Sequence, residues 1–344
     1  MGKINTLVVG QGLAGSVFSF MLYREQISFV VIDPGEASSA SLVAAGMFTP
    51  ISGQRKTIHP LTLQQIPVAT NFFREAEALL ACRLLHEQPV YQVFASATER
   101  DDFAAKMLQG NYAAHAVING TTPVNVPQEF GGAAISPSGW VDCKKFILQW
   151  RRWLEGRNLL VQESFDYSLF DVTPQANKYK DIEFENIVFC EGFRGMHNPF
   201  FADQHIVPCK GEVLTVKAPG SHVDYILKRS GIYLVPTGGQ GFKAGATYQW
   251  GNSSEEPDLT GRATIEATIG KLVTAAYEVT KHESGIRPTT KNREVIIAQH
   301  PLRKNMFMFN GLGTKGVLNA PWFAGKLLQQ YFKPSFPGEN NSAS

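Results

Sequence analysis

A glycine-rich turn between an apolar strand and a helix lies near the start of the chain, and it constrains the fold more than any other feature. The β-branched, apolar run Ile4–Val9 is typical of a buried strand. The pattern G-x-G-x-x-G follows over residues 10–15. Apolar residues at helical spacing come next: Ala14, Val17, Phe18, Met21 and Leu22. Phe29–Ile32 predicts a second strand, which ends at Asp33. This order predicts a βαβ unit and an α/β fold.

Each part of this unit has a physical role in binding a dinucleotide. Gly10 allows the tight turn after the strand, Gly12 lets the backbone approach a pyrophosphate, and Gly15 lets the helix pack closely on the sheet. Two residues open the helix and are expected to direct N–H groups and the helix dipole at the phosphates: Leu13 and Ala14. Asp33 follows Gly15 by 18 residues, close to the spacing of about 20 for an acid that contacts ribose hydroxyls. The unit alone does not separate NAD from FAD, and a chance glycine loop is the alternative.

Composition limits the class of protein. The chain has 344 residues, of which 44% are hydrophobic and 18% charged, so a folded protein of about two domains is expected. A net charge of +2 is too near neutral for a nucleic-acid binder, so no nucleic-acid partner is expected. No membrane span is predicted, because no apolar run approaches roughly 18 residues. No signal peptide is predicted, because the N-terminus lacks a long apolar segment and a small-residue cleavage site. The four cysteines form no C-x-x-C pair: Cys82, Cys143, Cys190 and Cys209. Reduced thiols and a cytoplasmic location are the plain interpretation.

The residues after the second strand favour FAD over NAD. No second G-x-G-x-x-G unit occurs. The small-residue stretch 38–50 suits a backbone that lies against a flat ligand, with an ordinary loop as the alternative. Its last seven residues read AAGMFTP. From here the chain resembles the D-amino-acid oxidase and glycine oxidase family of FAD-dependent oxidoreductases, in which such a segment runs beside the flavin.

The resemblance spans roughly residues 4–330. Two elements make it specific: Gly285–Thr290 is similar to the family's G-[LI]-R-P-x-T, and Gly311–Pro321 is similar to its last flavin loop and helix. Weaker matches follow the family's order: Gly139–Asp142, Leu159–Val161, Ile187–Gly192, Lys210–Leu214, Gly231–Pro236 and Gly245–Thr247. Asp142 is suited to cap a helix whose apolar face includes Phe146 and Trp150.

The resemblance implies two domains built from separated pieces, α+β overall. A Rossmann-like FAD-binding domain is expected over residues 1–50, 136–205 and 285–332. A substrate domain around an antiparallel sheet is expected over 51–135 and 206–284, and 333–344 would be a flexible tail. Helices near 62–82 and 263–280 are predicted to cover the antiparallel sheet.

The resemblance also implies contacts to a non-covalent FAD. The flavin would lie beside three residues of the small-residue stretch: Ala45, Gly46 and Met47. Phe165 would lie at the adenine, and Gly192 would return to the dinucleotide. The last loop would direct backbone N–H groups and a helix start at the flavin, through Gly311, Gly313, Thr314, Lys315, Gly316 and Val317. Lys315 would add positive charge, with a solvated loop lysine as the alternative. No cysteine falls in this loop, which favours a non-covalent cofactor.

Arg287 and Tyr233 are the residues expected to carry the chemistry. A guanidinium binds a carboxylate bidentately, and by resemblance Arg287 holds the amino-acid carboxylate over the flavin and so also contacts the cofactor. An ion pair with a buried acid is the alternative for Arg287. Tyr233 would add a hydroxyl to the same carboxylate, with a core tyrosine as the alternative. Tyr248 and Trp250 could line the pocket, but sheet core is the favoured interpretation. Arg55 is placed near the active site by resemblance alone.

Oxidation of this kind needs no catalytic base. The substrate amine loses its proton, hydride passes from the α-carbon to flavin N5, and the resulting imine hydrolyses in water, so the protein mainly holds the C–H bond in place. The partners expected are a small amine or amino acid and oxygen or another electron acceptor. The oligomeric state is left open.

Departures from the family pattern leave the substrate open. Asn292 stands where the family has Asp, and Val295 and Ala298 replace its next Pro and Gly. The last loop lacks the Arg of glycine oxidases, and Glu191 adds a carboxylate that must be hydrogen-bonded or paired. Three hypotheses result: an FAD-dependent oxidase or dehydrogenase of an amino acid or secondary amine, a flavoenzyme acting on a modified tRNA nucleotide, and a non-catalytic FAD-binding protein. The tRNA hypothesis depends on one basic helix, with Lys144, Lys145, Arg151 and Arg152.

Overall fold

The first sheet is built around the βαβ unit at the N-terminus. In the computed structural model, which describes residues 2–35, 39–53, 55–118, 126–172, 177–219, 225–237 and 241–333, β1 (Ile4–Val9) lies between β2 (Phe29–Ile32) and β14 (Ile182–Phe189). These three strands are parallel, and so are β11 (Leu160–Val161) on β2 and β22 (Met306–Asn310) on β14. Antiparallel strands complete the sheet: β12 (Phe170–Val172), β13 (Asn177–Tyr179) and β21 (Ile296–Gln299). The predicted strands Ile4–Val9 and Phe29–Ile32 are confirmed.

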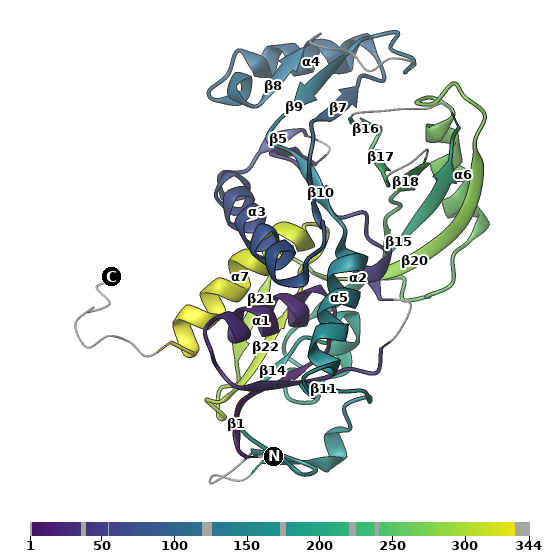
Figure 1. The fold of residues 1–344 in the computed structure, drawn as a ribbon. Helices are drawn as coiled ribbons and strands as arrows, with labels where there is room; N and C mark the ends of the chain where they lie inside the picture. The colour runs from purple at the N-terminus through teal and green to yellow at the C-terminus, as the bar shows by residue number, and fades with distance from the viewer. Residues whose placement is uncertain are drawn as a thin grey trace.

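Both faces of this sheet are covered, and its central strands β1 and β14 accordingly end in apolar runs, Leu7–Val9 and Ile187–Phe189. Val8 and Val31 face one core, and Leu7 and Val30 face the other. The first core contains four helices: α1 (Leu13–Arg24), α3 (Pro60–Leu80), α5 (Cys143–Glu155) and α7 (Gly316–Tyr331). Figure 1 shows α1, α5 and α7 over the strands in the lower part of the view. Asp142 caps α5 by accepting a hydrogen bond from the Lys145 N–H at 3.0 Å, as predicted.

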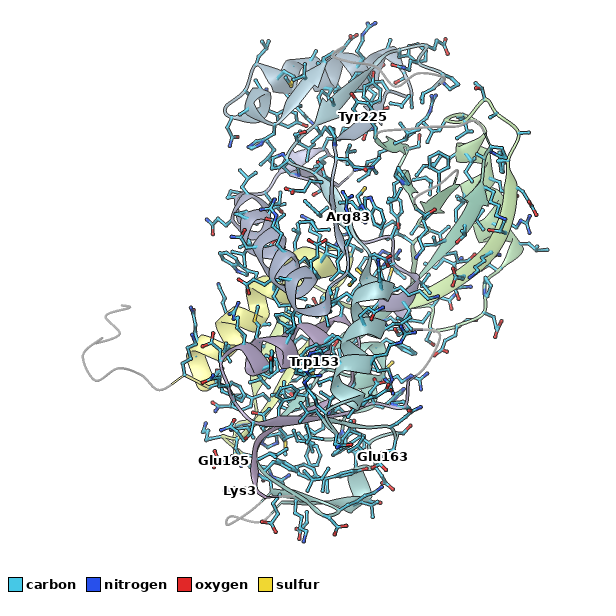
Figure 2. The ribbon with its side chains drawn as sticks, in the orientation of Figure 1. Lys3, Arg83, Trp153, Glu163, Glu185 and Tyr225 are labelled. Atoms are coloured by element: carbon cyan, nitrogen blue, oxygen red, sulfur yellow. The ribbon has the colours of Figure 1, made fainter. Side chains whose placement is uncertain are left out.

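The second sheet is mainly antiparallel and extends from the first toward the top of Figure 1. Its strand order is β19 (Gln249–Trp250), β15 (Ile206–Lys217), β18 (Gly241–Gly245), β17 (Ile232–Pro236), β16 (Ile226–Arg229), β7 (Val90–Val93), β9 (Gly132–Ile135) and β8 (Ala116–Ile118). The long strand β20 (Glu278–Thr290) pairs with β15. One face of the sheet packs on α6 (Leu259–Ile269) through Ile265 and Ile269, and α4 (Ala97–Met107) packs at the far end through Phe103. Figure 2 shows Tyr225 near this second sheet, whereas Lys3 and Glu185 mark the opposite end of the molecule.

Short elements join the two sheets. The strands β3 (Met47–Phe48), β10 (Gly139–Val141) and β6 (Leu85–Glu87) form one small sheet, and β4 (Ile51–Ser52) and β5 (Thr57–Ile58) form another. The short helix α2 (Ala40–Val43) and three 3₁₀ turns complete the fold: Tyr112–Ala114, Tyr167–Leu169 and Gly192–His197. The division into an FAD-binding and a substrate domain stays a prediction; β20 runs without a break across the expected boundary at residue 285. Residue 38 and the predicted tail from 334 onward lie outside the described residues.

Two helix predictions need correction. The helix expected at 62–82 does not cover the antiparallel sheet, because the apolar face of α3 packs on α1 and α5 instead. The Phe72 ring lies edge-on to Phe20 and to Phe146, at centroid distances of 5.1 and 6.0 Å. The helix expected at 263–280 does cover that sheet, but it begins at Leu259, where Asp258 caps it, and ends at Ile269.

Candidate functional site

A single large cavity runs from the end of β2 to the second sheet. Its volume is about 2940 Å³, well beyond the roughly 300–1,000 Å³ of a pocket for one small molecule, so it has room for a dinucleotide and a substrate. Every residue predicted to bind cofactor or substrate lines it except Gly15. Arg55 also lies on its wall and is exposed.

The glycine turn brings the start of α1 close to the strand β1. Gly10 has a φ of +97°, and a Cβ there would lie 2.5 Å from the Cys190 carbonyl oxygen. A Cβ on Gly15 would lie 1.8 Å from the Gly10 carbonyl oxygen, so only glycine permits this packing. Gly12 differs, since a Cβ there would meet only the Ser41 hydroxyl, at 3.5 Å. Gly12 therefore faces the cavity, where a backbone without a side chain admits a ligand.

Asp33 lies at the dinucleotide end of the cavity, held by three hydrogen bonds. It accepts from the backbone N–H of Gln11 at 2.7 Å and of Gly35 at 2.8 Å. The Arg151 guanidinium donates to the same carboxylate at 2.8 Å, and its side chain is only 12% exposed. Arg151 also pairs with Glu155 at 3.3 Å. The basic helix on which the tRNA hypothesis depends is therefore partly neutralised by its own neighbours.

Glu191 and Gly192 form the opposite wall of this end. The Glu191 carboxylate accepts hydrogen bonds from the Tyr167 hydroxyl and from the Asn198 amide at 2.8 Å, so the extra carboxylate is satisfied as it must be. Burial raises the pKa of Glu191, while the two hydrogen bonds act to lower it. Phe165 stacks on Tyr179 with ring centroids 4.4 Å apart, which presents a rigid apolar surface beside the 3₁₀ turn.

The last loop, from Gly311 to Gly316, is tied to the strands around it. The Gly313 N–H donates to the Pro288 carbonyl at 2.9 Å, and the Asn310 amide donates to the Gly192 carbonyl at 2.8 Å. Lys315 donates from Nζ to the Thr62 hydroxyl at 3.2 Å, and burial lowers its pKa. Lys315 is partly buried and hydrogen-bonded, which disfavours a fully solvated loop lysine, and its role beside the flavin stays a prediction. Helix α7 begins directly after it and points its N–H groups at the cavity, where negative charge is stabilised.

Among the residues that the structure describes, Arg287 is held in place by a carbonyl and an aromatic ring, with no acidic partner. Its Nη1 donates to the Thr247 carbonyl at 3.1 Å, and the guanidinium carbon lies 4.6 Å from the centroid of the Tyr248 ring. A Cβ on Gly211 would lie 2.1 Å from its Nη2, so glycine makes room for the guanidinium. Within the described part of the chain it forms no ion pair, so the ion-pair alternative has no partner there. Its remaining N–H donors can take a bidentate anion.

Tyr233 lies on the same cavity wall and stays protonated. Burial raises its pKa to about 12, against the opposing effect of the Arg287 charge. The hydroxyl is therefore a hydrogen-bond donor across the physiological range. Tyr248 and Trp250 are 53% and 48% exposed, so the prediction that they belong to the sheet core is wrong. They lie at and just before the short edge strand β19, and both line the cavity.

Lysines of the second sheet were missed by the sequence interpretation. Lys228 lines the cavity. Lys243 donates to the carbonyls of two cavity-lining residues, Val43 and Ala44, at 3.1 and 3.3 Å. For Lys228 a signal existed. The dipeptide Ser230-Gly231 is typical of a two-residue hairpin turn, which places Lys228 opposite Tyr233.

The cavity and both sheets agree with a known family. The family described as FAD dependent oxidoreductase matches residues 5–331. The chain belongs to this family. FAD is the family's cofactor, and the glycine turn, Asp33 and the last loop fit its dinucleotide and flavin parts. Cys143 and Cys190 line the cavity, but burial raises both thiol pKa values, to about 12 for Cys143, so neither is a reactive thiolate. The cofactor is accordingly non-covalent.

Individual members of the family are more distant. Glycine oxidase of Bacillus subtilis is 30% identical over 129 residues, which span 37% of this chain and 33% of that protein. The structure of glycine oxidase from Geobacillus kaustophilus is 21% identical, with a TM-score of 0.78 over 96% of this chain and 95% of that one. Iminodiacetate oxidase from Chelativorans sp. BNC1 is 16% identical, with a TM-score of 0.79 over 94% of each chain. These structures share the fold. No helix within the described ranges is long and apolar enough to cross a membrane.

Proposed function

We propose that the protein oxidises the C–N bond of an amino acid or a secondary amine that carries a carboxylate. The observation that supports this most directly is Arg287, a guanidinium on the cavity wall that the described residues leave without an acid. Tyr233 lies nearby with a protonated hydroxyl, and the last loop is hydrogen-bonded to Pro288, the residue after Arg287. A carboxylate bound by Arg287 would therefore lie next to the loop that is expected to hold the flavin.

The chain's own residues act by positioning. Arg287 would bind the substrate carboxylate, and Tyr233 would donate a further hydrogen bond to it. The bound flavin supplies the acceptor for the hydride that leaves the α-carbon. As the hydride leaves, the amine proton goes to solvent, and the imine that results hydrolyses to a carbonyl compound and an amine or ammonia. The start of α7 and Lys315 would stabilise the negative charge that develops at this end of the cavity.

The partners follow from this chemistry. A small amine or amino acid is the reductant, and oxygen or another electron acceptor completes the cycle. The names of the relatives make glycine and iminodiacetate the first compounds to test. We also place the enzyme in the cytoplasm, since all four cysteines are free thiols.

A flavoenzyme acting on tRNA is less well supported, because Arg151 of its basic helix is engaged with Asp33 and Glu155. In a non-catalytic flavoprotein, the guanidinium of Arg287 would face the cavity without a substrate anion to bind.

The experiment is an anaerobic titration of the purified yellow protein with carboxylate-bearing amines, followed by visible absorbance. Loss of the oxidised flavin bands supports the proposal. Arg287→Met should keep the bound flavin and lower the efficiency of its reduction by these amines roughly 100-fold. Flavin that no amine or amino acid reduces, in a protein that stays yellow, would instead point to the non-catalytic hypothesis.

A further inference from the structure

Lys228 and Tyr233 are neighbours on one face of the second sheet. The turn residues Ser230 and Gly231 have φ angles of 48° and 85°, the signature of a type I′ hairpin. This turn pairs Lys228 directly with Tyr233 across β16 and β17. Side chains of directly opposed residues lie on the same face, with Cβ atoms about 4.5–5.5 Å apart. Both line the cavity, so Lys228 lies beside the tyrosine expected to bind the substrate.

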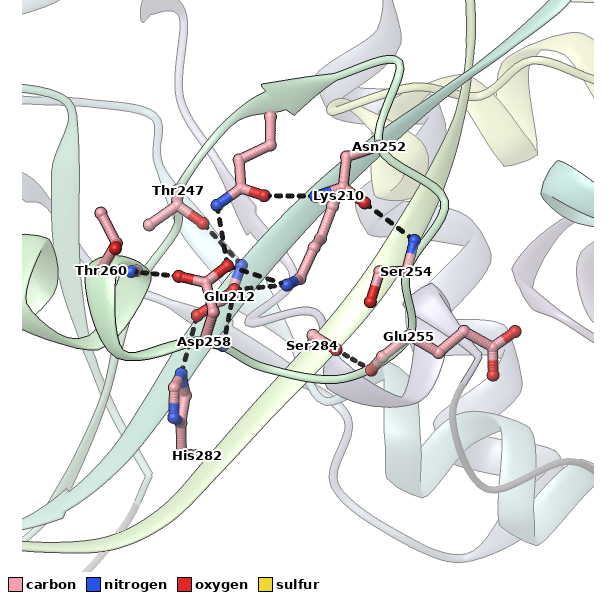
Figure 3. A network of polar contacts seen from close by, with 12 residues as sticks. Lys210, Glu212, Thr247, Asn252, Ser254, Glu255, Asp258, Thr260, His282 and Ser284 are labelled. Carbon is pink, nitrogen blue, oxygen red and sulfur yellow. Dashed lines mark hydrogen bonds and ion pairs between the residues drawn. The ribbon is translucent and has the colours of Figure 1, made fainter.

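Lys210, a buried lysine of the same sheet, is an example of a lysine whose charge is paired with carboxylates. Lys210 pairs with Glu212 at 2.8 Å and with Asp258 at 3.1 Å, and its side chain is 2% exposed. The other Glu212 oxygen lies 2.8 Å from Nε2 of His282 (Figure 3). Burial lowers the pKa of Lys210, but the two carboxylates more than offset this and raise it. The charge of Lys210 is therefore compensated within the chain.

Lys228 has no such compensation. Its ammonium makes neither a hydrogen bond nor an ion pair with any residue that the structure describes. Two further lysines act on it from the cavity wall, Lys56 and Lys315, and the one carboxylate that acts on it, Glu99, is bound by Lys56 at 2.7 Å. Burial, followed by the two lysine charges, lowers the pKa of Lys228 to about 8. Among the described residues that line the cavity and act on Lys228, two are lysines and one is a carboxylate, so the charge at this part of the wall is net positive.

We propose that Lys228 binds a second anionic group of the substrate, so that the enzyme acts on an amino acid or secondary amine that carries two acidic groups. This rests on the proposed oxidation of a carboxylate-bearing amine. In the strand order β20, β15, β18, β17, β16, Tyr233 stands between Arg287 and Lys228. Arg287 takes the carboxylate next to the reacting carbon, and Lys228 takes the distal group. Lys228 is partly buried, and an unpaired cation in such a place is unfavourable; an anionic substrate offsets this cost when it binds.

Matched substrates and ligands test this inference. Each pair differs by one acidic group: aspartate against alanine, iminodiacetate against N-methylglycine, and 2-amino-3-phosphonopropionate against alanine to distinguish a phosphonate from a carboxylate. Wild-type kcat/KM should be about 10- to 100-fold higher for the diacid, as expected for one charge-assisted hydrogen bond in a buried site. A second readout needs no turnover: dissociation constants of malonate and succinate against acetate and propionate, from the shift of the flavin absorbance.

Three variants locate the effect. Lys228→Met should remove the preference for diacids in both readouts, and Lys228→Arg should restore most of it. Lys217→Met is the matched control, because Lys217 lies on β15 outside the cavity and is exposed. Equal kcat/KM and equal dissociation constants for the mono- and diacids in the wild type would overturn the inference while leaving amine oxidation intact.

The two proposals fail separately. Tight, Lys228-dependent binding of dicarboxylates without reduction by any amine would support Lys228 as the site of the second anion and refute the proposed reaction. A diacid preference that persists in Lys228→Met would refute the assignment of Lys228. If Lys228→Met does not fold, the wild-type comparison of mono- and diacids alone decides, because a cavity without an anion subsite shows no preference.

Discussion

The two ends of the cavity are built by different means. At the dinucleotide end, the glycine turn and Asp33 belong to one contiguous stretch of about thirty residues, and Asp33 is hydrogen-bonded to two backbone N–H groups and to Arg151. At the other end, Arg287, Tyr233 and Lys228 come from three strands of the second sheet, and two of them are cations that the described chain leaves uncompensated. The first end is suited to a cofactor that stays bound. The second end carries positive charge from Arg287 and Lys228, which suits an anionic substrate that binds and is released.

The sharpest way to break the dinucleotide end is to add a side chain at Gly15. In Gly15→Val the new atoms would collide with the Gly10 carbonyl, so we expect a loss of more than about 3 kcal/mol in unfolding free energy and little flavin in the purified protein. Flavin content and thermal unfolding measure this. Gly12→Ala is the control, since its Cβ meets only Ser41 at 3.5 Å: the apoprotein should unfold normally while FAD binds more weakly. A normal flavin content in Gly15→Val would contradict the close packing of α1 on β1.

At the other end, Arg287→Met should leave the fold and flavin content unchanged. We expect kcat/KM for carboxylate-bearing amines to fall roughly 100-fold, because two charge-assisted hydrogen bonds are lost. Gly211→Ala should give a similar loss by displacing the guanidinium, whose Nη2 would lie 2.1 Å from the new Cβ. Unchanged kinetics in both variants would show that the carboxylate binds elsewhere.

The pH dependence of binding tests whether the positive charge of Lys228 binds the second anion. The pKa of Lys228 is lowered to about 8 by burial and by Lys56 and Lys315, against Glu99, so its proton is lost as the pH rises through that value. Affinity for a dicarboxylate, relative to a monocarboxylate, should then fall about tenfold per pH unit above pH 8. Lys228→Arg should abolish this decline up to pH 10, since a guanidinium stays charged. A ratio that stays flat in the wild type would exclude Lys228 as the group that binds the second anion.

The smallest effect is expected for Tyr233→Phe. Loss of one hydrogen bond from a neutral hydroxyl to the substrate carboxylate should raise the KM for the substrate about 10-fold and change kcat little. The Tyr233 pKa is raised to about 12, so the hydroxyl should cause no loss of binding below pH 11. An ionisation near pH 10 that disappears in Tyr233→Phe would contradict this environment.

Local patterns predicted the dinucleotide end well. Ile4–Val9, Phe29–Ile32 and the cap at Asp142 were predicted because their signals lie within a few residues of one another. The position of α3 was not, because its apolar face fits either sheet and only the aromatic contacts of Phe72 decide. Tyr248 and Trp250 were assigned to the core because alternation shows that they share a face but not which face is covered.

Lys228 shows a third case, in which the signal was present but not used. A Ser-Gly turn fixes the register of its hairpin, and register alone places the lysine beside Tyr233. No local pattern shows whether a carboxylate lies opposite Lys228, because that depends on strands far apart in the chain. The charge balance of the cavity is therefore a tertiary property.

The hydrogen bond from Gly313 to Pro288 has one more consequence. Arg287 and Pro288 are adjacent, so a single peptide unit, about 3.3 Å of strand, links the carboxylate-binding residue to the anchor of the last loop. The covalent chain thus fixes the distance between the backbone of Arg287 and the anchor of the last loop at Pro288. Any displacement of β20 would therefore move Arg287 and the anchor of the last loop together, because both belong to the same strand.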